Sequence, residues 1–329
     1  MANVRSLAAL RDGPKRVLVT GGSGFIGRHL VSALSASGAH VRVLDLEPHP
    51  DPNIDIVLGD IAEPNVVERA LDSRFDSVVH LAAVTSVLRS VEHPELTHRT
   101  NVTGTGLLLE RARAIGVRSL AFASTNAVTG PTDAPAITEA APLRPLTPYG
   151  STKAAAEMLM SAYTAAYGLR CACLRFTNVY GPGMQAKDSI VARLMRAIQV
   201  GTTFEIYGDG RQVRDYVHVH DVVDALQRAL GDERWSGPTV IGTGTSLSVL
   251  DVVDQARRVT GAPLPVRHCE AKAGEMPAVI VDPSLAHARG WSPRYAFTEG
   301  LAGVWEEWSG DVLGDDSRQL QQRAAGAAL

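Results

Sequence analysis

Tyr149 and Lys153 stand four residues apart in the stretch TPYGSTKAAAE, where the sequence predicts that a helix begins. Residues at this spacing lie on one face of a helix, so the phenol and the ammonium point the same way. An unperturbed tyrosine has a pKa of about 10, which is too high for a base near neutrality. Because a neighbouring positive charge favours the phenolate, the pair predicts a tyrosine that Lys153 makes usable as a base.

A glycine-rich turn near the amino terminus forms a second chemical pattern. Gly21, Gly24 and Gly27 lie between a β-branched apolar run, residues 17–19, and apolar residues that recur at helical spacing. In such a strand–turn–helix unit the glycines permit a tight turn, close approach of a pyrophosphate and close helix packing. The N-terminal end of the helix then offers N–H groups and a positive dipole end to phosphates. The pattern predicts a dinucleotide site.

Two acidic positions bear on the identity of that dinucleotide. Asp45 ends the second apolar run, where a carboxylate can accept hydrogen bonds from both ribose hydroxyls and would repel a 2′-phosphate. It therefore favours NAD over NADP, the alternative being a solvated acid at a strand end. Asp60 and Ile61, in the stretch GDI, are predicted to flank the adenine, and an acid in a turn is the alternative for Asp60.

Alternating strands and helices are needed to position these residues. Apolar runs at residues 40–46, 77–83, 119–125 and 170–176 are separated by helical patterns. This alternation predicts a doubly wound parallel α/β sheet, followed by a smaller mixed α/β lobe. The expected domains are an N-terminal extension (1–14), an NAD-binding domain (15–178, with some later segments returning to it), a substrate lobe (179–308) and a loose tail (309–329).

Composition excludes several other classes of protein. The net charge is −3, so no basic field favours nucleic acid, and no run reaches the roughly 20 apolar residues of a membrane span. Cys171 and Cys173 alternate in an apolar run, which predicts buried thiols on one strand face and a reducing compartment. No cysteine or histidine spacing matches a metal site. We therefore expect a cytoplasmic protein without a metal.

The motifs together resemble the extended short-chain dehydrogenase/reductase family, in its nucleotide-sugar epimerase/dehydratase branch. The resemblance covers roughly residues 16–308 and rests on VTGGSGFIG, HLAA, NVTGT, ASTNAVTG, PYGSTK, RFTNVYGPG and YGDGRQVRDYVHVHDVV. It implies a tightly bound NAD that takes a hydride from sugar C4 and later returns it. It also implies a set of cofactor-binding residues: Gly21, Gly24, Phe25, Ile26, Gly27, Asp45, Asp60, Ile61, Leu81, Ala82, Ala83, Tyr149 and Lys153.

The stretch ASTNAVTG favours one reaction of this branch. Thr125 falls where the family keeps a hydroxyl that hydrogen-bonds the reacting sugar hydroxyl. Asn126 and Ala127 stand where similar 4,6-dehydratases carry Asp and Glu, and where similar uronate decarboxylases carry Glu in the second place. Neither Asn126 nor Ala127 can ionise. The resemblance therefore implies C4 epimerisation catalysed by Thr125, Tyr149 and Lys153. A 4,6-dehydratase or uronate decarboxylase with substitute acids, and a non-catalytic NAD-sensing protein, remain as alternatives.

The resemblance also implies a site for a UDP-sugar or dTDP-sugar. The expected substrate residues include Thr125 and Asn126 at the strand end. Further along the chain they are Asn178, Arg214, Lys272, Glu275 and Val279. An arginine suits a diphosphate because its guanidinium donates in a fixed fork, whereas Lys272 would bind less specifically. Relatives of this branch commonly pair through the helix that carries the tyrosine, so we expect a homodimer.

Overall fold

The computed structural model describes residues 16–132, 134–270 and 279–310. These form two compact units. The first comprises the described residues up to Thr177 together with His220–Gly244 and Val281–Ser292. The second comprises Asn178–Val219 and the described residues of 245–280 and 293–310. The predicted N-terminal extension and nearly all of the predicted tail lie outside the described residues.

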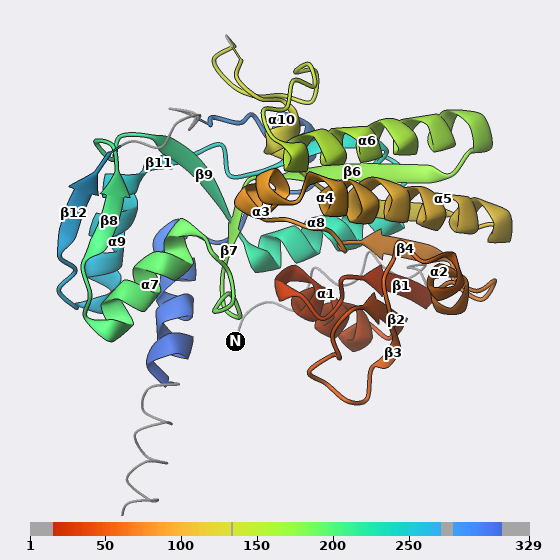
Figure 1. Ribbon diagram of the computed structural model, residues 1–329, viewed down its shortest axis with the longest axis horizontal. Helices are drawn as coiled ribbons and strands as arrows, with labels where there is room; N and C mark the ends of the chain where they lie inside the picture. Colours follow the sequence, from red (N-terminus) through yellow and green to blue (C-terminus); the bar gives the residue numbers. More distant parts are fainter. Residues whose placement is uncertain (1–15, 133, 271–278, 311–329) are drawn as a thin grey trace, which may run out of the picture. The chain divides into compact units, whose positions relative to one another are not determined.

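The first unit is built on a seven-stranded parallel sheet with the strand order β10-β6-β5-β4-β1-β2-β3 (Figure 1). The order reverses direction between β1 and β4, as in a dinucleotide-binding fold. The prediction of a doubly wound sheet is confirmed. The strands are β1 (Arg16–Thr20), β2 (His40–Asp45), β3 (Asp55–Leu58), β4 (Ser77–His80), β5 (Ser119–Thr125), β6 (Arg170–Phe176) and β10 (Gly237–Ile241).

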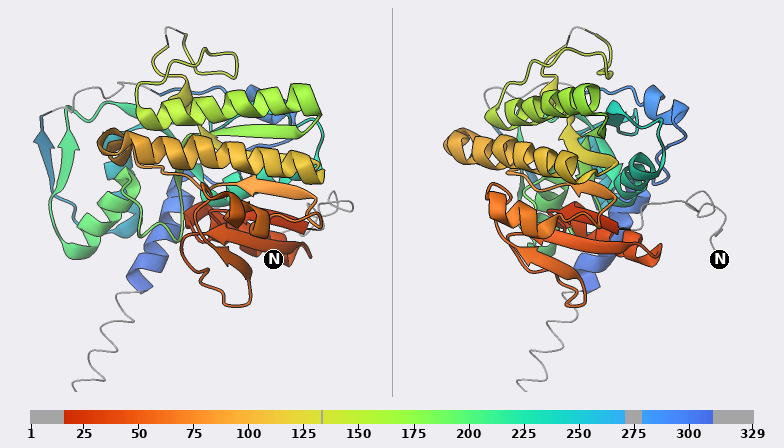
Figure 2. Two further views of the ribbon diagram at one scale, coloured as in Figure 1. Left: turned by 45° about the vertical axis from the view of Figure 1, so that its right-hand side comes forward. Right: turned by 90° about the vertical axis from the view of Figure 1, so that its right-hand side faces the viewer.

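Helices cover both faces of this sheet. On one face α2, α5 and α6 share a buried core with β1, β4, β5 and β6, and Figure 2 shows α5 and α6 side by side. On the other, His29 of α1 contacts His220 of α8. The helices are α1 (Phe25–Ala36), α2 (Pro64–Ala70), α3 (Val87–Glu92), α4 (Pro94–His98), α5 (Gly104–Ile115), α6 (Pro148–Tyr167), α8 (Val219–Gly231) and α10 (Ser284–Ala288), with a π-helical turn η2 (Arg99–Thr103) and a 3-10 turn η3 (Asn126–Val128).

Helix α6 begins where the sequence predicts. The Thr147 hydroxyl accepts from the N–H of Gly150 and caps the helix, and Pro148 occupies the first turn, where its missing N–H costs nothing. Gly168 ends the helix in the left-handed conformation. Near its start, a Cβ on Gly150 would lie 2.6 Å from the carbonyl oxygen of Ala127. A glycine is therefore required where α6 passes the end of β5.

The second unit contains two small sheets, which confirms the prediction of a smaller mixed lobe. Strand β9 pairs in parallel with β7 and antiparallel with β11, and β8 pairs in parallel with β12. A helix also covers residues 297–310. The remaining elements are β7 (Asn178–Tyr180), β8 (Phe204–Tyr207), β9 (Val213–His218), β11 (Ser246–Ser248), β12 (Val266–Cys269), α7 (Ile190–Val200) and α9 (Val249–Thr260).

Two features are absent from the described residues. None of the helices in these ranges combines the length and the apolar character needed to cross a membrane. Within the same ranges, no three His, Cys, Asp or Glu side chains are grouped so that they could hold a metal ion.

Candidate functional site

The glycine turn between β1 and α1 is shaped by close backbone contacts. Gly21 has a φ of +72°, and a Cβ on it would lie 2.6 Å from the backbone nitrogen of Ala82. A Cβ on Gly27 would lie 2.2 Å from the carbonyl oxygen of Gly21. Within the described chain, no side chain caps the N-terminus of α1 and no acid stands in its first turn. The positive end of α1 is therefore suited to an anionic group such as a diphosphate.

Asp45 lies beside this turn at the carboxyl end of β2. One of its carboxylate oxygens, Oδ2, accepts from the backbone N–H of Ser23 at 2.9 Å, and Oδ1 accepts from that of Glu47 at 3.2 Å. These bonds fix the carboxylate next to the glycine turn, at the strand position from which it can accept from ribose hydroxyls. The residues present therefore fit an NAD molecule with its diphosphate at α1.

Of the other residues expected around the cofactor, some lie beside the glycine turn and some in the core. Leu81, Ala82 and Ala83 follow β4, and Ala82 packs against the glycine turn. Ile61 is 4% exposed and belongs to the core. Both carboxylate oxygens of Asp60 are already engaged: Oδ1 accepts from the N–H of Ala62, and Oδ2 forms an ion pair with Arg99 at 2.6 Å. The place of Asp60 beside the adenine stays a prediction.

The structure brings Thr125, Tyr149 and Lys153 together at the carboxyl end of β5. Thr125 ends that strand, Tyr149 lies in the first turn of α6, and the Thr125 hydroxyl lies near enough to the phenol to lower its pKa. Lys153 is 2% exposed, and its Nζ donates to the carbonyl oxygen of Ala123 at 2.9 Å. The same Nζ lies 4.5 Å from the ring centroid of Phe122. The phenol and the ammonium are therefore held against the same strand end.

The ionisation of this pair differs from the sequence-based expectation in one respect. Burial raises the pKa of Tyr149 to about 12, and the nearby Thr125 hydroxyl only partly opposes that rise. Burial also lowers the pKa of Lys153 to about 7. Lost hydration disfavours the charged form of each group, and this effect exceeds the attraction that the sequence argument considered. In the protein alone, Tyr149 therefore remains a neutral phenol near neutrality.

The residues that follow Thr125 form the turn η3. The Thr125 hydroxyl accepts from the N–H of Ala127 at 3.2 Å, and Asn126 is the first residue of the turn. Thr129 is buried, and its hydroxyl donates to the carbonyl oxygen of Asn126 at 2.8 Å. The side chains of Asn126 and Ala127 thus lie next to the candidate catalytic hydroxyls and carry no ionisable group.

In the second unit, β9 brings three of the expected substrate residues together. Asn178 is exposed on β7, and its Nδ2 donates to the carbonyl oxygen of Asp215 at 2.9 Å. Arg214 lies on β9 and donates to the carbonyl oxygen of Val213 at 2.8 Å. The N–H of Val279 donates to that same carbonyl oxygen at 3.1 Å, and the Val279 side chain is 3% exposed. Lys272 and Glu275 lie outside the described residues.

The sequence reasoning missed two further candidate site residues, Tyr216 and Asn101. Tyr216 lies two residues after Arg214, on the same face of β9, and its buried hydroxyl has no hydrogen-bond partner among the described residues. A buried polar group usually has a hydrogen-bond partner, so this hydroxyl is available to a polar ligand. Asn101, in η2, accepts from the N–H of Val84 and donates to the hydroxyl of Thr152 on α6. The sequence signals were the motifs RDY and NVTGT, which were noted only as part of a resemblance.

Comparison with known proteins shows one consistent family. The model of the NAD dependent epimerase/dehydratase family matches residues 17–242. A UDP-glucose 4-epimerase of Mycolicibacterium smegmatis is 35% identical over 301 residues, which cover 87% of this chain and 96% of that relative.

Solved structures give the same result. A UDP-glucose 4-epimerase of Thermus thermophilus in complex with NAD has a TM-score of 0.83 and 34% identity, covering 90% of this chain and 99% of that one. MoeE5 in complex with UDP-glucuronic acid and NAD has a TM-score of 0.84 and 38% identity, with the same two coverages.

Proposed function

We propose that this chain, which belongs to the NAD dependent epimerase/dehydratase family, is an enzyme that reversibly inverts C4 of a UDP-hexose. The observation that carries the proposal is the grouping of Thr125, Tyr149 and Lys153 at the end of β5, in the same unit as the glycine turn. Two of the similar proteins described above are UDP-glucose 4-epimerases, and the third was solved with a UDP-sugar and NAD.

The proposed roles follow from the contacts of each side chain. Tyr149 takes the proton from the sugar O4, and Thr125, beside Tyr149, aligns that hydroxyl. Lys153 supplies a positive charge that favours the phenolate. NAD, when bound, would accept the C4 hydride and later return it, and its nicotinamide would add a second positive charge that favours the phenolate. The hydride leaves one face of C4 and returns to the other, so the reaction has no net redox change.

A dehydratase or decarboxylase is the runner-up within the family. Such a reaction needs an acid to protonate a leaving hydroxyl or a base at C5. Asn126 and Ala127, beside Thr125, supply neither. A non-catalytic NAD-sensing protein is the alternative from another class. It would not need a tyrosine and a lysine held against one strand end, which is the arrangement found here.

We propose that the nucleotide part of the substrate binds to residues of the second unit. Arg214 and Asn178 supply donors for a diphosphate, and Tyr216 supplies an unpartnered hydroxyl. Val279, a small side chain, is proposed to leave room in the sugar pocket for a larger substituent such as an N-acetyl group. Lys272 and Glu275 are proposed to contact the phosphate and ribose groups. A uridine or thymidine nucleotide fits this chemistry equally.

We also propose a homodimer and a cytoplasmic location. The dimer is supported by exposed apolar side chains on two helices that pack together: Val87, Leu88 and Val91 of α3, and Met158 and Tyr167 of α6. Exposed apolar groups on packed helices are often found at protein interfaces. The location is supported by Cys171 and Cys173, which are buried free thiols.

The function is tested by incubating the purified protein with a panel of UDP- and dTDP-sugars that includes UDP-glucuronic acid. Products are identified by NMR and mass spectrometry. We expect a C4 epimer with the mass of its substrate. A product that has lost water or carbon dioxide would instead identify a lyase, and the absence of turnover with every sugar would favour the NAD-sensing protein.

Asp45 is expected to determine the choice of cofactor. Asp45→Asn removes the charge that repels a 2′-phosphate and should narrow the preference for NAD over NADP by at least about tenfold. The measurement is the ratio of dissociation constants for the two dinucleotides, obtained by calorimetry. Asp254→Asn, at an exposed acid of α9, is the matched control and should leave the ratio unchanged. An unchanged ratio of dissociation constants in Asp45→Asn would show that Asp45 does not contact the ribose.

A further inference from the structure

Glu157 is a buried carboxylate that the proposed chemistry does not use. It lies on α6 four residues beyond Lys153 and eight beyond Tyr149, so the three side chains follow one face of the helix. Only 6% of Glu157 is exposed. Burying a carboxylate costs free energy unless the charge is paired, so the partners of Glu157 indicate its role.

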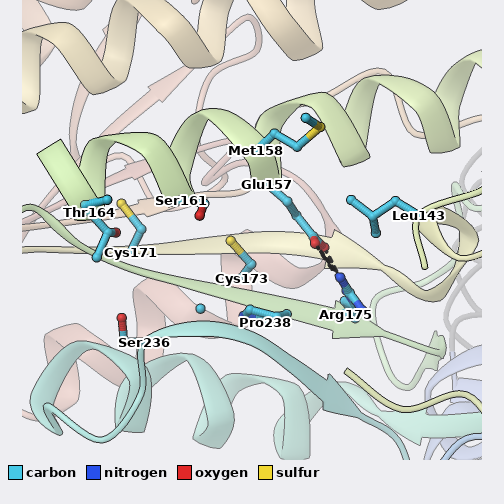
Figure 3. Close-up of a pocket in the computed structure, with 12 residues that line it drawn as sticks. Leu143, Glu157, Met158, Ser161, Thr164, Cys171, Cys173, Arg175, Ser236 and Pro238 are labelled. Atoms are coloured by element: carbon cyan, nitrogen blue, oxygen red, sulfur yellow. Dashed lines mark hydrogen bonds and ion pairs between the residues drawn. The ribbon is translucent and has the colours of Figure 1, made fainter. Parts of the chain in front are cut away.

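The carboxylate of Glu157 is held by two residues of neighbouring strands. Arg175 of β6 donates to it from Nε at 3.0 Å and from Nη2 at 2.7 Å, and the Ser124 hydroxyl of β5 also donates to it. Ser124 and Arg175 face each other in the β5–β6 register. Figure 3 shows Glu157 and Arg175 pointing toward one another. This fork geometry fixes the position of the carboxylate.

Three consecutive residues of β5 therefore contact three successive turns of α6. Thr125 lies beside the Tyr149 hydroxyl, the carbonyl oxygen of Ala123 accepts from Lys153, and Ser124 donates to Glu157. A shift of Glu157 along the strand would move the whole helix face with it. The contact at Glu157 thus fixes the register of the candidate catalytic pair.

The charges around Lys153 point to a second effect of Glu157. On β4, His80 is buried and neutral, because burial lowers its pKa to about 3. On β6, burial raises the pKa of the Cys173 thiol well above its usual value, so it is neutral as well. On α6, Tyr149 is a neutral phenol, and Glu157 is the acid that raises the pKa of Lys153 against the effect of burial. Arg175 on β6 carries the remaining charge and is paired with Glu157.

We propose that Glu157 is a positioning residue for the catalytic pair, with its carboxylate fixed by Ser124 and Arg175 so that it stabilises the ammonium form of Lys153. The inference rests on the proposed function of Tyr149 and Lys153. Glu157 itself touches neither substrate nor cofactor in this scheme. It acts through the charge of Lys153.

A pocket beside this ion pair offers a direct way to test the role of the charge. The pocket has a volume of about 500 Å³ and is lined by Glu157 and Arg175 together with Met158, Cys173 and Pro238, among others (Figure 3). Truncating Glu157 to alanine would enlarge this pocket at the point where the carboxylate stood. A small carboxylate from solution could then occupy that position.

The main test is the titration of Lys153 in the NAD-bound protein. The ε-methylene signal of Lys153 is followed by NMR in ¹³C-lysine-labelled protein and assigned with Lys153→Met. Glu157→Gln keeps the shape and removes the charge, so the midpoint should fall by at least about one pH unit. The alkaline limb of the kcat profile should fall with it, because a neutral Lys153 no longer favours the phenolate. Glu110→Gln on α5 is the control and should shift neither.

Each outcome decides the proposal. An unchanged Lys153 midpoint in Glu157→Gln would overturn the proposal, even if kcat fell. Glu157 would then have a structural role and no effect on the charge of Lys153. If that variant does not fold, Glu157→Gln combined with Arg175→Gln leaves no unpaired buried charge, and a smaller fall in the Lys153 midpoint is expected because the cation of Arg175 is lost as well. The NMR titration needs no turnover, so a failure of the proposed function and a failure of this inference are distinguishable.

Chemical rescue supplies a second readout. Acetate added to Glu157→Ala should restore part of the lost kcat and raise the Lys153 midpoint, whereas the neutral acetamide should do neither. Equal effects of acetate and acetamide would contradict a role for the charge.

Discussion

Replacing Tyr149 with phenylalanine is expected to lower kcat for C4 epimerisation by about 10²–10⁴-fold, the usual contribution of a positioned general base. The substitution removes the hydroxyl beside Thr125 and leaves the ring in place on α6. The glycine turn and Asp45 are untouched, so NAD should remain bound. The measurements are the initial rate of product formation and the NAD content of the purified variant.

Tyr163→Phe is the matched control for this result. Tyr163 lies on the same helix, and its hydroxyl donates to the exposed Glu110 of α5 at 3.2 Å. Loss of that hydroxyl should leave the rate unchanged. If Tyr149→Phe kept the wild-type rate, Tyr149 would not be the base, and the proposed chemistry would lose its principal residue.

Gly27→Ala should abolish tight binding of NAD. The added Cβ would lie 2.2 Å from the carbonyl oxygen of Gly21. Neither atom can move away by a side-chain rotation, because the oxygen belongs to the backbone and a Cβ is bonded directly to it. The glycine turn must shift, and with it the N-terminus of α1 that is suited to the diphosphate. We expect at least about a tenfold weaker affinity for NAD together with a lower melting temperature.

Gly106→Ala, in α5, provides the comparison for Gly27→Ala. A Cβ there would meet nothing within 4 Å, and alanine favours the helix over glycine by about 1 kcal/mol. That variant should bind NAD normally and melt at an equal or higher temperature. Retention of wild-type NAD affinity in Gly27→Ala would show that the turn does not hold the diphosphate.

The sequence predicts the parallel sheet and the shared helix face of Tyr149 and Lys153 well, for identifiable reasons. Residues 171–174 are apolar in succession because β6 is buried on both faces, and glycines mark the turn after β1. Tyr149 and Lys153 are recognisable because a fixed helical spacing converts directly into a shared face. The cap at Thr147 and Pro148 also lies within a few residues of α6, so the start of the helix could be located.

Features that depend on distant contacts could not be read in the same way. The predicted place of Asp60 beside the adenine did not include Arg99, which lies 39 residues later in the chain and pairs with it. The pKa argument for Tyr149 counted a neighbouring charge but not the burial that raises the value. The sequence alone gives no signal for Glu157, because its partners Ser124 and Arg175 come from two strands that lie elsewhere in the chain. Burial and pairing across strands are properties of the folded chain.

The central claim is that the C4 hydrogen leaves one face of the sugar as a hydride and returns to the other. It is tested most directly by incubating the protein with UDP-glucose that carries deuterium at C4 and following the product by NMR. The account predicts UDP-galactose that keeps the deuterium at C4, with no incorporation of solvent hydrogen there. Loss of that deuterium to solvent, or a deuterated product that has lost water, would contradict it.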